Sequence, residues 1–284
     1  MRKVDDEYGD SWWFKVWGPD NLAEEGIGDR EDWMIRAEDK WHGFGDLAAG
    51  FNMLDPIKAT VLTPGIDVQG DFADVGIPAT IVTKYLAEHG VIVEKTGLYS
   101  FFIMFTIGIT KGRWNTLLTA LQQFKSDYDA NQPLWRVLPD FVAQHPRYEK
   151  IGLRDLCDSI HGIYRANDIG RLTTEIYQSN LEPAMKPADA FARMAHREIE
   201  RVAIENLEGR ITAILLTPYP PGIPLLIPGE RFNKKIVDYL RFTREFNSAF
   251  PGFDTDVHGL VATTEMQGVT VEDGRYSVDC VRAE

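Results

Sequence analysis

Two apolar runs separated by a short polar turn form the strongest β pattern in the chain. Residues 91–93 are continuous and β-branched, residues 101–107 are aromatic and β-branched, and Gly97 lies between the two runs. Uninterrupted apolar runs of this kind are typical of strands that are covered on both faces. The pattern therefore predicts a buried β-hairpin with Glu94 and Lys95 at its tip.

Glu94 raises an electrostatic question because of its predicted position. A carboxylate at the end of a buried strand needs a cation or several donors, since leaving it unpaired costs several kcal/mol or shifts its pKa. Its partner could be Lys95 or a surface arginine. The other alternative is the cationic end of a bound ligand.

The remaining periodicity predicts an α+β fold. Apolar residues recur at helical spacing in residues 78–90, 112–132, 153–163, 168–178, 187–207 and 236–250. Strand patterns occupy residues 12–17, 57–62, 210–216, 258–262 and 275–281, the last two joined by a turn near Asp273 and Gly274. The polar, breaker-rich residues 129–133 predict a domain boundary, which divides the chain into residues 1–131 and 132–284.

A proline-rich loop follows the predicted strand 210–216. Residues 217–230 alternate prolines and glycines with apolar side chains, and they include Tyr219 and Glu230. Such a loop is rigid and extended, because proline can take part in neither a helix interior nor a central strand. It would suit the wall of a pocket or channel, and it would suit a structural crossover equally well.

Composition narrows the class of protein. The chain has 284 residues, 44% of them hydrophobic, and a formal net charge of -13. An acidic chain of this kind is not expected to bind nucleic acid or an anionic membrane, since both need a basic face. The charge would suit a basic substrate, although a solvated acidic surface is the commoner explanation. No segment approaches the roughly 20 apolar residues of a membrane span, and the start has no signal-peptide core, so a cytoplasmic location is expected.

Tryptophans are dense near the start of the chain. Trp12, Trp13 and Trp17 fall within one predicted strand, and Trp33 and Trp41 follow. So much aromatic surface is normally covered at a domain edge. The pattern leads us to expect that a further segment precedes Met1 in a longer product.

Side chains with the chemistry of metal ligands are few. Asp254, Asp256 and His258 alternate and would share one face of a strand. No second cluster in the sequence completes a four-ligand shell, so no metal site is predicted. Capping and surface pairing are the expected roles of these side chains. His161 lies beside the apolar stripe of its helix, where a hydrogen-bonded histidine is expected. Cys157 and Cys280 are too few for a disulfide framework and are interpreted as buried thiols.

Several longer runs carry a family resemblance. Residues 54–65, 76–78, 91–97, 218–230 and 251–259 resemble, in the same order, the C-terminal half of the bacterial ornithine/lysine/arginine decarboxylases. These are pyridoxal-phosphate enzymes of the aspartate-aminotransferase fold type. The resemblance implies that residues 1–131 form the small domain, with a mixed or antiparallel sheet and helices, which packs on the pyridoxal-phosphate domain. Residues 132–284 would form a C-terminal α+β domain with outer helices.

The same resemblance shows what the chain lacks. In the family a lysine in a Ser-x-His-Lys motif of the preceding large domain holds the cofactor as a Schiff base, and no His-Lys pair occurs here. The resemblance therefore places pyridoxal phosphate in that preceding domain and no catalytic residue in this chain.

The resemblance also implies roles for residues that are present. It makes Glu94 the carboxylate that binds the distal cationic group of the substrate. Tyr219 and Glu230 are weaker candidates for the active-site channel, and the expected role of these two residues is structural support. Lysine is the favoured substrate, with arginine and ornithine as the others. The partners would be the rest of the decarboxylase, its homodimer partner and a basic amino acid. The alternative is a non-catalytic binding or regulatory module that associates with an intact decarboxylase subunit.

The chain as given should neither form a Schiff base with pyridoxal phosphate nor release carbon dioxide from lysine, arginine or ornithine, because it lacks the family's lysine motif. Absorbance spectroscopy with added cofactor and a carbon dioxide assay check this. Either signal would contradict the interpretation of the chain as the C-terminal part of a decarboxylase.

Overall fold

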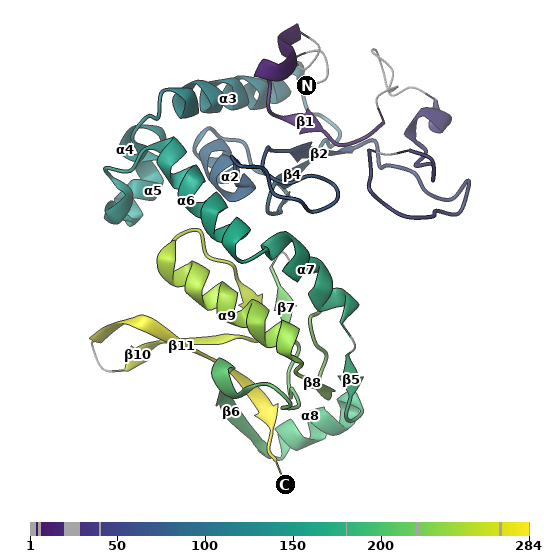
Figure 1. The fold of residues 1–284 in the computed structure, drawn as a ribbon, viewed down its shortest axis with the longest axis vertical. Helices are drawn as coiled ribbons and strands as arrows, with labels where there is room; N and C mark the ends of the chain where they lie inside the picture. The colour runs from purple at the N-terminus through teal and green to yellow at the C-terminus, as the bar shows by residue number, and fades with distance from the viewer. Residues whose placement is uncertain are drawn as a thin grey trace. The chain divides into compact units, whose positions relative to one another are not determined.

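The computed structural model describes residues 4, 7–19, 29–39, 41–179, 181–219, 222–266 and 269–283, without the side chains of residue 10 and residues 263–275 (Figure 1). The chain forms two compact units, Met1–Arg165 and Ala166–Glu284. Each combines helices with antiparallel strands, so the predicted α+β class is confirmed. The boundary predicted near residue 131 lies inside the first unit, and it stays a prediction about the domains of the family.

The first unit is built from a small sheet and several helices. Its strands are β1 (Lys15–Val16), β2 (Lys58–Leu62), β3 (Lys95–Thr96) and β4 (Ser100–Met104), and its helices are α2 (Ala79–Glu88), α3 (Lys111–Asp129), α4 (Leu134–Val137), α5 (Pro139–Gln144) and α6 (Leu153–Ala166), with short 3-10 turns at Gly9–Ser11, Arg30–Trp33 and Pro146–Tyr148. The predicted helices at residues 78–90, 112–132 and 153–163 are therefore present.

The four strands are all antiparallel to their neighbours, in the order β1-β2-β4-β3. Strand β2 pairs with β4 along its whole length, from Lys58 opposite Met104 to Leu62 opposite Ser100. Side chains of a strand alternate between the two faces of the sheet, and Phe101 and Ile103 of β4 are the buried ones. Helix α2 contacts both β4 and α3, so this face of the sheet forms part of the core of the unit.

The predicted buried hairpin is only partly right. Strands β3 and β4 do form a hairpin, but residues 91–93 are not a strand, and Ile92 is 88% exposed. The reason lies at the end of α2, where Gly90 has a positive φ of 75°. The N–H of Gly90 donates to Ala87 O, and the N–H of Val91 donates to Leu86 O. This pair of bonds closes the helix in a Schellman motif, so Val91 serves the helix end and not a sheet.

The tryptophan-rich start is covered largely by the chain itself. Trp12 and Phe14 are buried, and Phe14 meets Phe124 of α3 edge-to-face with ring centroids 6.0 Å apart. Trp13 contacts Tyr128 in the same way, at 4.9 Å. The strand itself is shorter than predicted and reduces to β1. Residues 20–28 and 40 lie outside the described residues.

The second unit contains helices, a three-stranded sheet and two short strand pairs. Its elements are α7 (Ile169–Gln178), β5 (Glu182–Pro183), α8 (Pro187–Ala195), β6 (Ile199–Ala203), a 3-10 turn (Ile204–Asn206), β7 (Thr217–Pro218), β8 (Glu230–Arg231), α9 (Lys234–Ala249), β9 (Val257–His258), β10 (Val261–Met266) and β11 (Val269–Val281). The sheet has the order β10-β11-β6, and β5 pairs with β8 and β7 with β9. Helices α7 and α9 confirm the helices predicted at residues 168–178 and 236–250. Helix α9 contacts both α7 and β11.

The long helix predicted for residues 187–207 is wrong. Helix α8 ends at Ala195, and the following apolar residues form β6, which pairs with β11. Arg197 adopts a left-handed φ of 60°, and the N–H of Glu198 donates to Arg193 O at 2.8 Å. The helix thus stops in a Schellman-like turn with arginine in the place where glycine is usual. No glycine or proline marks this stop in the sequence, so the apolar spacing alone predicts a continuous helix.

Two further strand predictions are corrected. Residues 210–216 form only isolated bridges, since the hydroxyl of Thr212 donates to Ile214 O and accepts the N–H of Ile214, which turns the backbone locally. The turn of the last hairpin is not at Asp273 and Gly274, which lie inside β11. The pair Met266 and Val269 places the reversal earlier, so β11 is much longer than predicted.

The substitution Arg197→Gly should stabilise the second unit by about 1 kcal/mol. A non-glycine residue in the left-handed region costs roughly 1–2 kcal/mol, which glycine removes. Part of this gain is offset because glycine raises the conformational entropy of the unfolded chain. Urea denaturation measures the change. Gly90→Ala, at the equivalent place after α2, is the matched control and should destabilise by a similar amount. A destabilised Arg197→Gly protein would contradict the assignment.

Candidate functional site: a carboxylate at the end of the first sheet

Glu94 lies immediately before β3 and is exposed, which corrects the expectation that it is buried at a strand end. Its backbone N–H donates to Phe102 O at 3.0 Å, so the ladder between β3 and β4 positions the residue. Within the described part of the chain, no side chain forms an ion pair or a hydrogen bond with its carboxylate, Lys95 included. The backbone therefore positions this carboxylate, and no described side chain occupies its oxygens.

The two loop candidates lie in the second unit and have different surroundings. Tyr219 is exposed, and its N–H donates to Asp256 O at 2.8 Å, which continues the pairing of β7 with β9. Glu230 begins β8, and its carboxylate accepts the N–H of Ile227 at 2.8 Å. The structure places these residues in different strand pairs and brings them into no common site. The Glu230 carboxylate stabilises the turn that begins at Ile227, whereas the Tyr219 side chain is exposed to solvent.

His161 of α6 is a buried structural histidine, as expected. Its Nδ1 lies 2.6 Å from the hydroxyl of Tyr99, and its Nε2 lies 2.9 Å from Ala73 O. A carbonyl only accepts, so Nε2 carries the proton and Nδ1 accepts from the Tyr99 hydroxyl in the neutral ring. Burial raises the pKa of Tyr99, which keeps that hydroxyl protonated. The pair joins α6 to β4 and to the loop before α2.

Two glycines allow this pair to fit. A side chain at Gly76 would overlap the His161 ring, and one at Gly65, which has a positive φ of 139°, would overlap the Tyr99 ring. The loop can therefore close over the pair only with glycine at these positions.

The other residues with the chemistry of metal ligands form no cluster in the part of the chain that the structure describes. No three His, Cys, Asp or Glu side chains of these described residues come together as a metal site. Asp254 accepts the N–H of Gly252 at 2.9 Å and so closes a turn after α9. Cys157 and Cys280 are free and buried, and burial raises the pKa of the Cys280 thiol to about 12.

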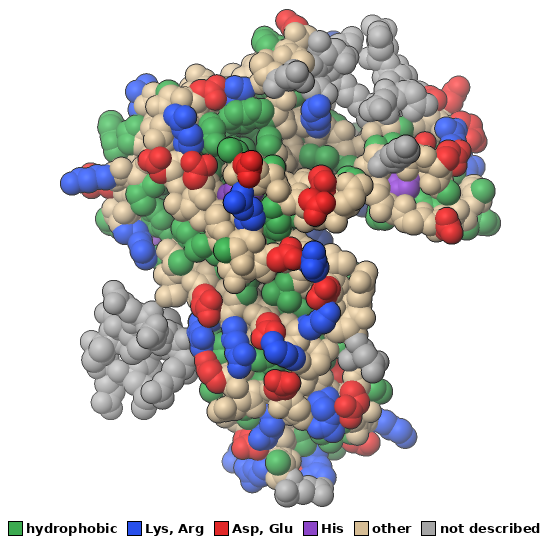
Figure 2. Space-filling view, in the orientation of Figure 1, with side chains coloured by type: hydrophobic (Ala, Val, Ile, Leu, Met, Phe, Trp, Pro, Cys, Tyr) green, Lys and Arg blue, Asp and Glu red, His purple; other side chains and the backbone are tan. Residues whose placement is uncertain are grey.

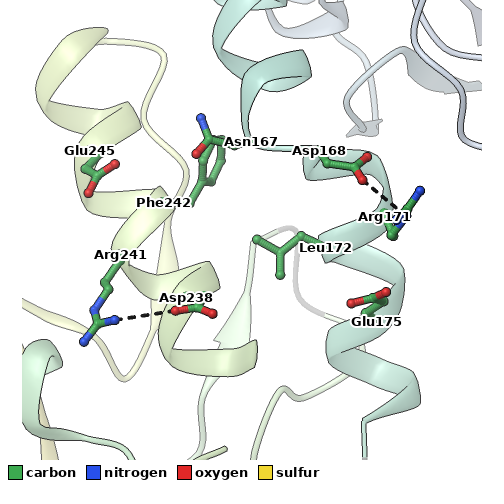
Figure 3. A pocket seen from close by; sticks show the side chains of 9 residues that line it. All are labelled: Asn167, Asp168, Arg171, Leu172, Glu175, Asp238, Arg241, Phe242 and Glu245. Carbon is green, nitrogen blue, oxygen red and sulfur yellow. Dashed lines mark hydrogen bonds and ion pairs between the residues drawn. The ribbon is translucent and has the colours of Figure 1, made fainter. Parts of the chain in front are cut away.

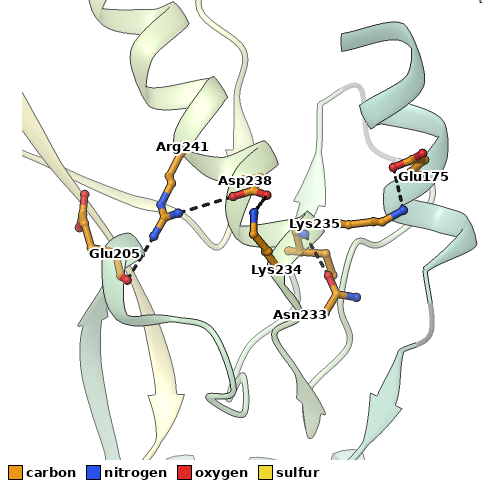
Figure 4. Close-up of polar contacts among 8 residues, drawn as sticks. Glu175, Glu205, Asn233, Lys234, Lys235, Asp238 and Arg241 are labelled. Carbon is orange, nitrogen blue, oxygen red and sulfur yellow. Dashed lines mark hydrogen bonds and ion pairs between the residues drawn. The ribbon is translucent and has the colours of Figure 1, made fainter. Parts of the chain in front are cut away.

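A shallow hollow of about 420 Å³ lies in the second unit between α7 and α9 (Figure 3). It was not predicted, although the charges at helical spacing in α9 were a possible signal. Lys235 reaches Glu175 at 2.7 Å, and Asp238 accepts from Lys234 and Arg241 (Figure 4). Figure 2 shows the same mixture of acidic and basic side chains over this face. These charges largely neutralise one another, so the hollow offers little free charge to a ligand.

A second hollow, of about 390 Å³, lies in the first unit between the end of α2, at His89, and the start of α3, at Gly112. Neither hollow is lined by a lysine. Among the described residues these hollows therefore do not fit pyridoxal phosphate, whose family site depends on a Schiff-base lysine. No described helix is both long and apolar enough to cross a membrane.

Comparison with known proteins identifies the family. Residues 1–113 match the model of the Orn/Lys/Arg decarboxylase major domain, and residues 170–282 match the model of the Orn/Lys/Arg decarboxylase C-terminal domain. The chain is 48% identical to lysine decarboxylase LdcA of Pseudomonas aeruginosa over 276 residues, which cover 95% of this chain and 36% of LdcA. It is 40% identical to the constitutive lysine decarboxylase of Escherichia coli, over 96% of this chain and 37% of that protein.

Solved structures agree with this assignment. The structure of lysine decarboxylase A from Pseudomonas aeruginosa superposes with a TM-score of 0.90 at 45% identity, over 99% of this chain and 38% of that one. The chain belongs to the Orn/Lys/Arg decarboxylase family and corresponds to the C-terminal portion of its members. It spans little more than a third of the length of these relatives. Arginine and ornithine decarboxylases of the family match at lower identity.

Replacing Tyr99→Phe should destabilise the first unit by about 1–3 kcal/mol, because it leaves the buried Nδ1 of His161 without a donor. Denaturant unfolding monitored by fluorescence measures the loss. The control Tyr8→Phe removes an exposed hydroxyl of the same unit and should change stability by no more than about 0.5 kcal/mol. Equal effects of the two substitutions would show that the hydrogen bond contributes nothing measurable.

Proposed function

We propose that this chain is the C-terminal part of a basic amino-acid decarboxylase that acts on lysine, and that Glu94 binds the distal ammonium group of the substrate. The observation that carries the proposal is the Glu94 carboxylate, held by the β3–β4 ladder and unpaired among the described residues. A carboxylate with a fixed backbone and free oxygens is suited to a cationic ligand, since an ammonium group can donate charge-assisted hydrogen bonds to it.

Lysine is favoured over the other basic amino acids on the evidence of the relatives. Those matched at higher identity are named lysine decarboxylases, whereas the arginine and ornithine decarboxylases match less well. A single carboxylate selects a basic side chain over a neutral one but does not measure its length. The preference for lysine therefore comes from the family comparison and not from the geometry of Glu94.

The resemblance assigns pyridoxal phosphate, and with it the chemical step, to the preceding domain of a full-length enzyme. The contribution of this chain is to bind and orient the substrate. In the second unit, Tyr219 is better suited than Glu230 to line the channel, because its side chain is exposed while the Glu230 carboxylate is already bonded to Ile227. The partners in this proposal are the rest of the decarboxylase and a second copy of the full-length protein.

The proposal is tested in a full-length chimera in which residues 1–284 replace the matching part of LdcA. The chimera should decarboxylate lysine when supplied with pyridoxal phosphate. A folded chimera that binds the cofactor and decarboxylates none of the three basic amino acids would support a non-catalytic module instead.

In that chimera, Glu94→Gln should lower kcat/KM for lysine by roughly 10- to 150-fold, which corresponds to a charge-assisted hydrogen bond of about 1.5–3 kcal/mol. The absorbance of the bound cofactor should not change, because Glu94 is proposed to contact the substrate alone. Steady-state kinetics and absorbance spectra check both statements.

The matched control is Glu149→Gln, which removes an exposed carboxylate of the same unit and should leave kcat/KM unchanged. Unchanged kinetics in Glu94→Gln would remove Glu94 from the substrate site. A changed cofactor spectrum would contradict a role limited to the substrate.

A further inference from the structure

The backbone around Glu94 is fixed at two places that lie close together in the sequence. On one side, the N–H of Glu94 donates to Phe102 O at 3.0 Å. On the other side, the N–H of Val91 donates to Leu86 O at 2.9 Å, in the Schellman motif that ends α2. Only residues 92–93 separate the two bonded positions. Three peptide steps span at most about 11 Å, so the direction in which the chain leaves α2 limits where Glu94 can lie.

Helix α2 gives this short link a fixed starting point. Tyr85 and Leu86 in its last turn are buried, and the helix contacts β3, β4 and α3. The His89 ring stacks on the Tyr85 ring with centroids 4.2 Å apart, and its Nδ1 lies 2.8 Å from Tyr85 O. A carbonyl only accepts, so His89 donates this bond to the last turn of the helix. Because the helix end is held in this way, the turn at residue 90 sets the direction of the link.

Gly90 makes this turn possible through its backbone conformation and not through tight surroundings. Its φ of 75° lies in the left-handed region. A Cβ built at this position would meet no atom within 4 Å. A side chain therefore has room at position 90, but most residues other than glycine are strained there by the backbone conformation itself. Rotation of the backbone between Gly90 and Glu94 would relieve such strain and move the carboxylate.

Helix α3 shows which residue can replace Gly90 without this strain. It ends in the same motif, in which the N–H of Gln132 donates to Asp127 O at 2.9 Å. Asn131 occupies the place that corresponds to Gly90, with a left-handed φ of 46°. Asparagine tolerates this region because its short polar side chain can form hydrogen bonds locally. Asparagine is therefore the conservative substitution at position 90, and alanine is the disruptive one.

We infer that Gly90 is a positioning residue for the Glu94 carboxylate. Its left-handed turn and the bond from Glu94 to Phe102 together fix the carboxylate where the substrate ammonium group binds. The inference rests on the proposed function and extends it to a residue that does not touch the substrate. A binding group that is already held in place loses little further freedom when the ligand binds, so the fixed link favours affinity. A strained turn would leave the carboxylate present but displaced.

Three single substitutions in the full-length chimera with LdcA test the inference. Gly90→Ala strains the turn, Gly90→Asn preserves it, and Gly50→Ala is the matched control. Gly50 lies in the same unit, has a positive φ of 82° and also has no atom within 4 Å of its Cβ position, but it is distant from Glu94 in the sequence. The two alanine substitutions should therefore destabilise the first unit to a similar extent, which urea denaturation measures.

Gly90→Ala should raise KM for lysine roughly three- to tenfold and leave kcat and the absorbance of the bound cofactor unchanged, because it weakens substrate binding and not the chemical step. Gly90→Asn and Gly50→Ala should keep KM within about twofold of the unsubstituted chimera. An unchanged KM in Gly90→Ala would overturn the inference. An equal rise in Gly90→Asn or Gly50→Ala would also overturn it, because the effect would then not depend on the left-handed turn at position 90.

The double substitution with Glu94→Gln separates this inference from the proposed function. If Gly90 acts through the Glu94 carboxylate, Gly90→Ala should raise KM no further in the Glu94→Gln chimera. A rise of the same size in both backgrounds would overturn the positioning role and leave the substrate role of Glu94 intact. Unchanged kinetics in Glu94→Gln alone would overturn the proposed role of Glu94, and with it the positioning role.

Discussion

The antiparallel pairing of β2 with β4 is the constraint on which the first unit depends. Its register sets which side chains of β4 enter the core, with Phe101 and Ile103 buried. A slip of one residue would turn these side chains to the other face, so the buried aromatic and aliphatic surface holds the register. Glu94 is positioned by the same strand, because its N–H is bonded to Phe102 O.

Buried hydrogen bonds extend this order to the elements around the sheet. Tyr99 precedes β4, and its hydroxyl bonds to His161 of α6, while its carbonyl accepts the N–H of Thr63 at the end of β2. The hydroxyl of Thr63 donates to Ile77 O, just before α2. The hairpin, the loop before α2 and helix α6 therefore form one bonded system at the end of the sheet where β4 starts.

The charged side chains around α7 and α9 and the carboxylate of Glu94 have different surroundings. Around α7 and α9 the charged side chains bond to one another, as Lys235 does to Glu175, and this hydrogen bond lowers the pKa of Glu175. Surface pairs of this kind contribute little to stability and leave little charge for a ligand. Glu94 is the contrasting case, a carboxylate placed by backbone bonds and unpaired among the described residues. That contrast, and not acidity alone, favours a binding role for Glu94.

The sequence alone determined the α+β class, most of the helices and the family, because apolar periodicity, helix breakers and long family motifs are local signals. Only the tertiary structure showed that Glu94 is exposed, that the chain after Ala195 leaves the helix, and that residues 91–93 are no strand. In each case the deciding bond joins residues whose pattern is ambiguous: Arg197 takes the left-handed conformation that glycine usually supplies, and Val91 donates to Leu86 of the preceding helix. The exposure of a side chain depends on which other segments cover it. The sequence could therefore indicate that Glu94 needs a cation, while its exposure and its lack of a partner among the described residues required the fold.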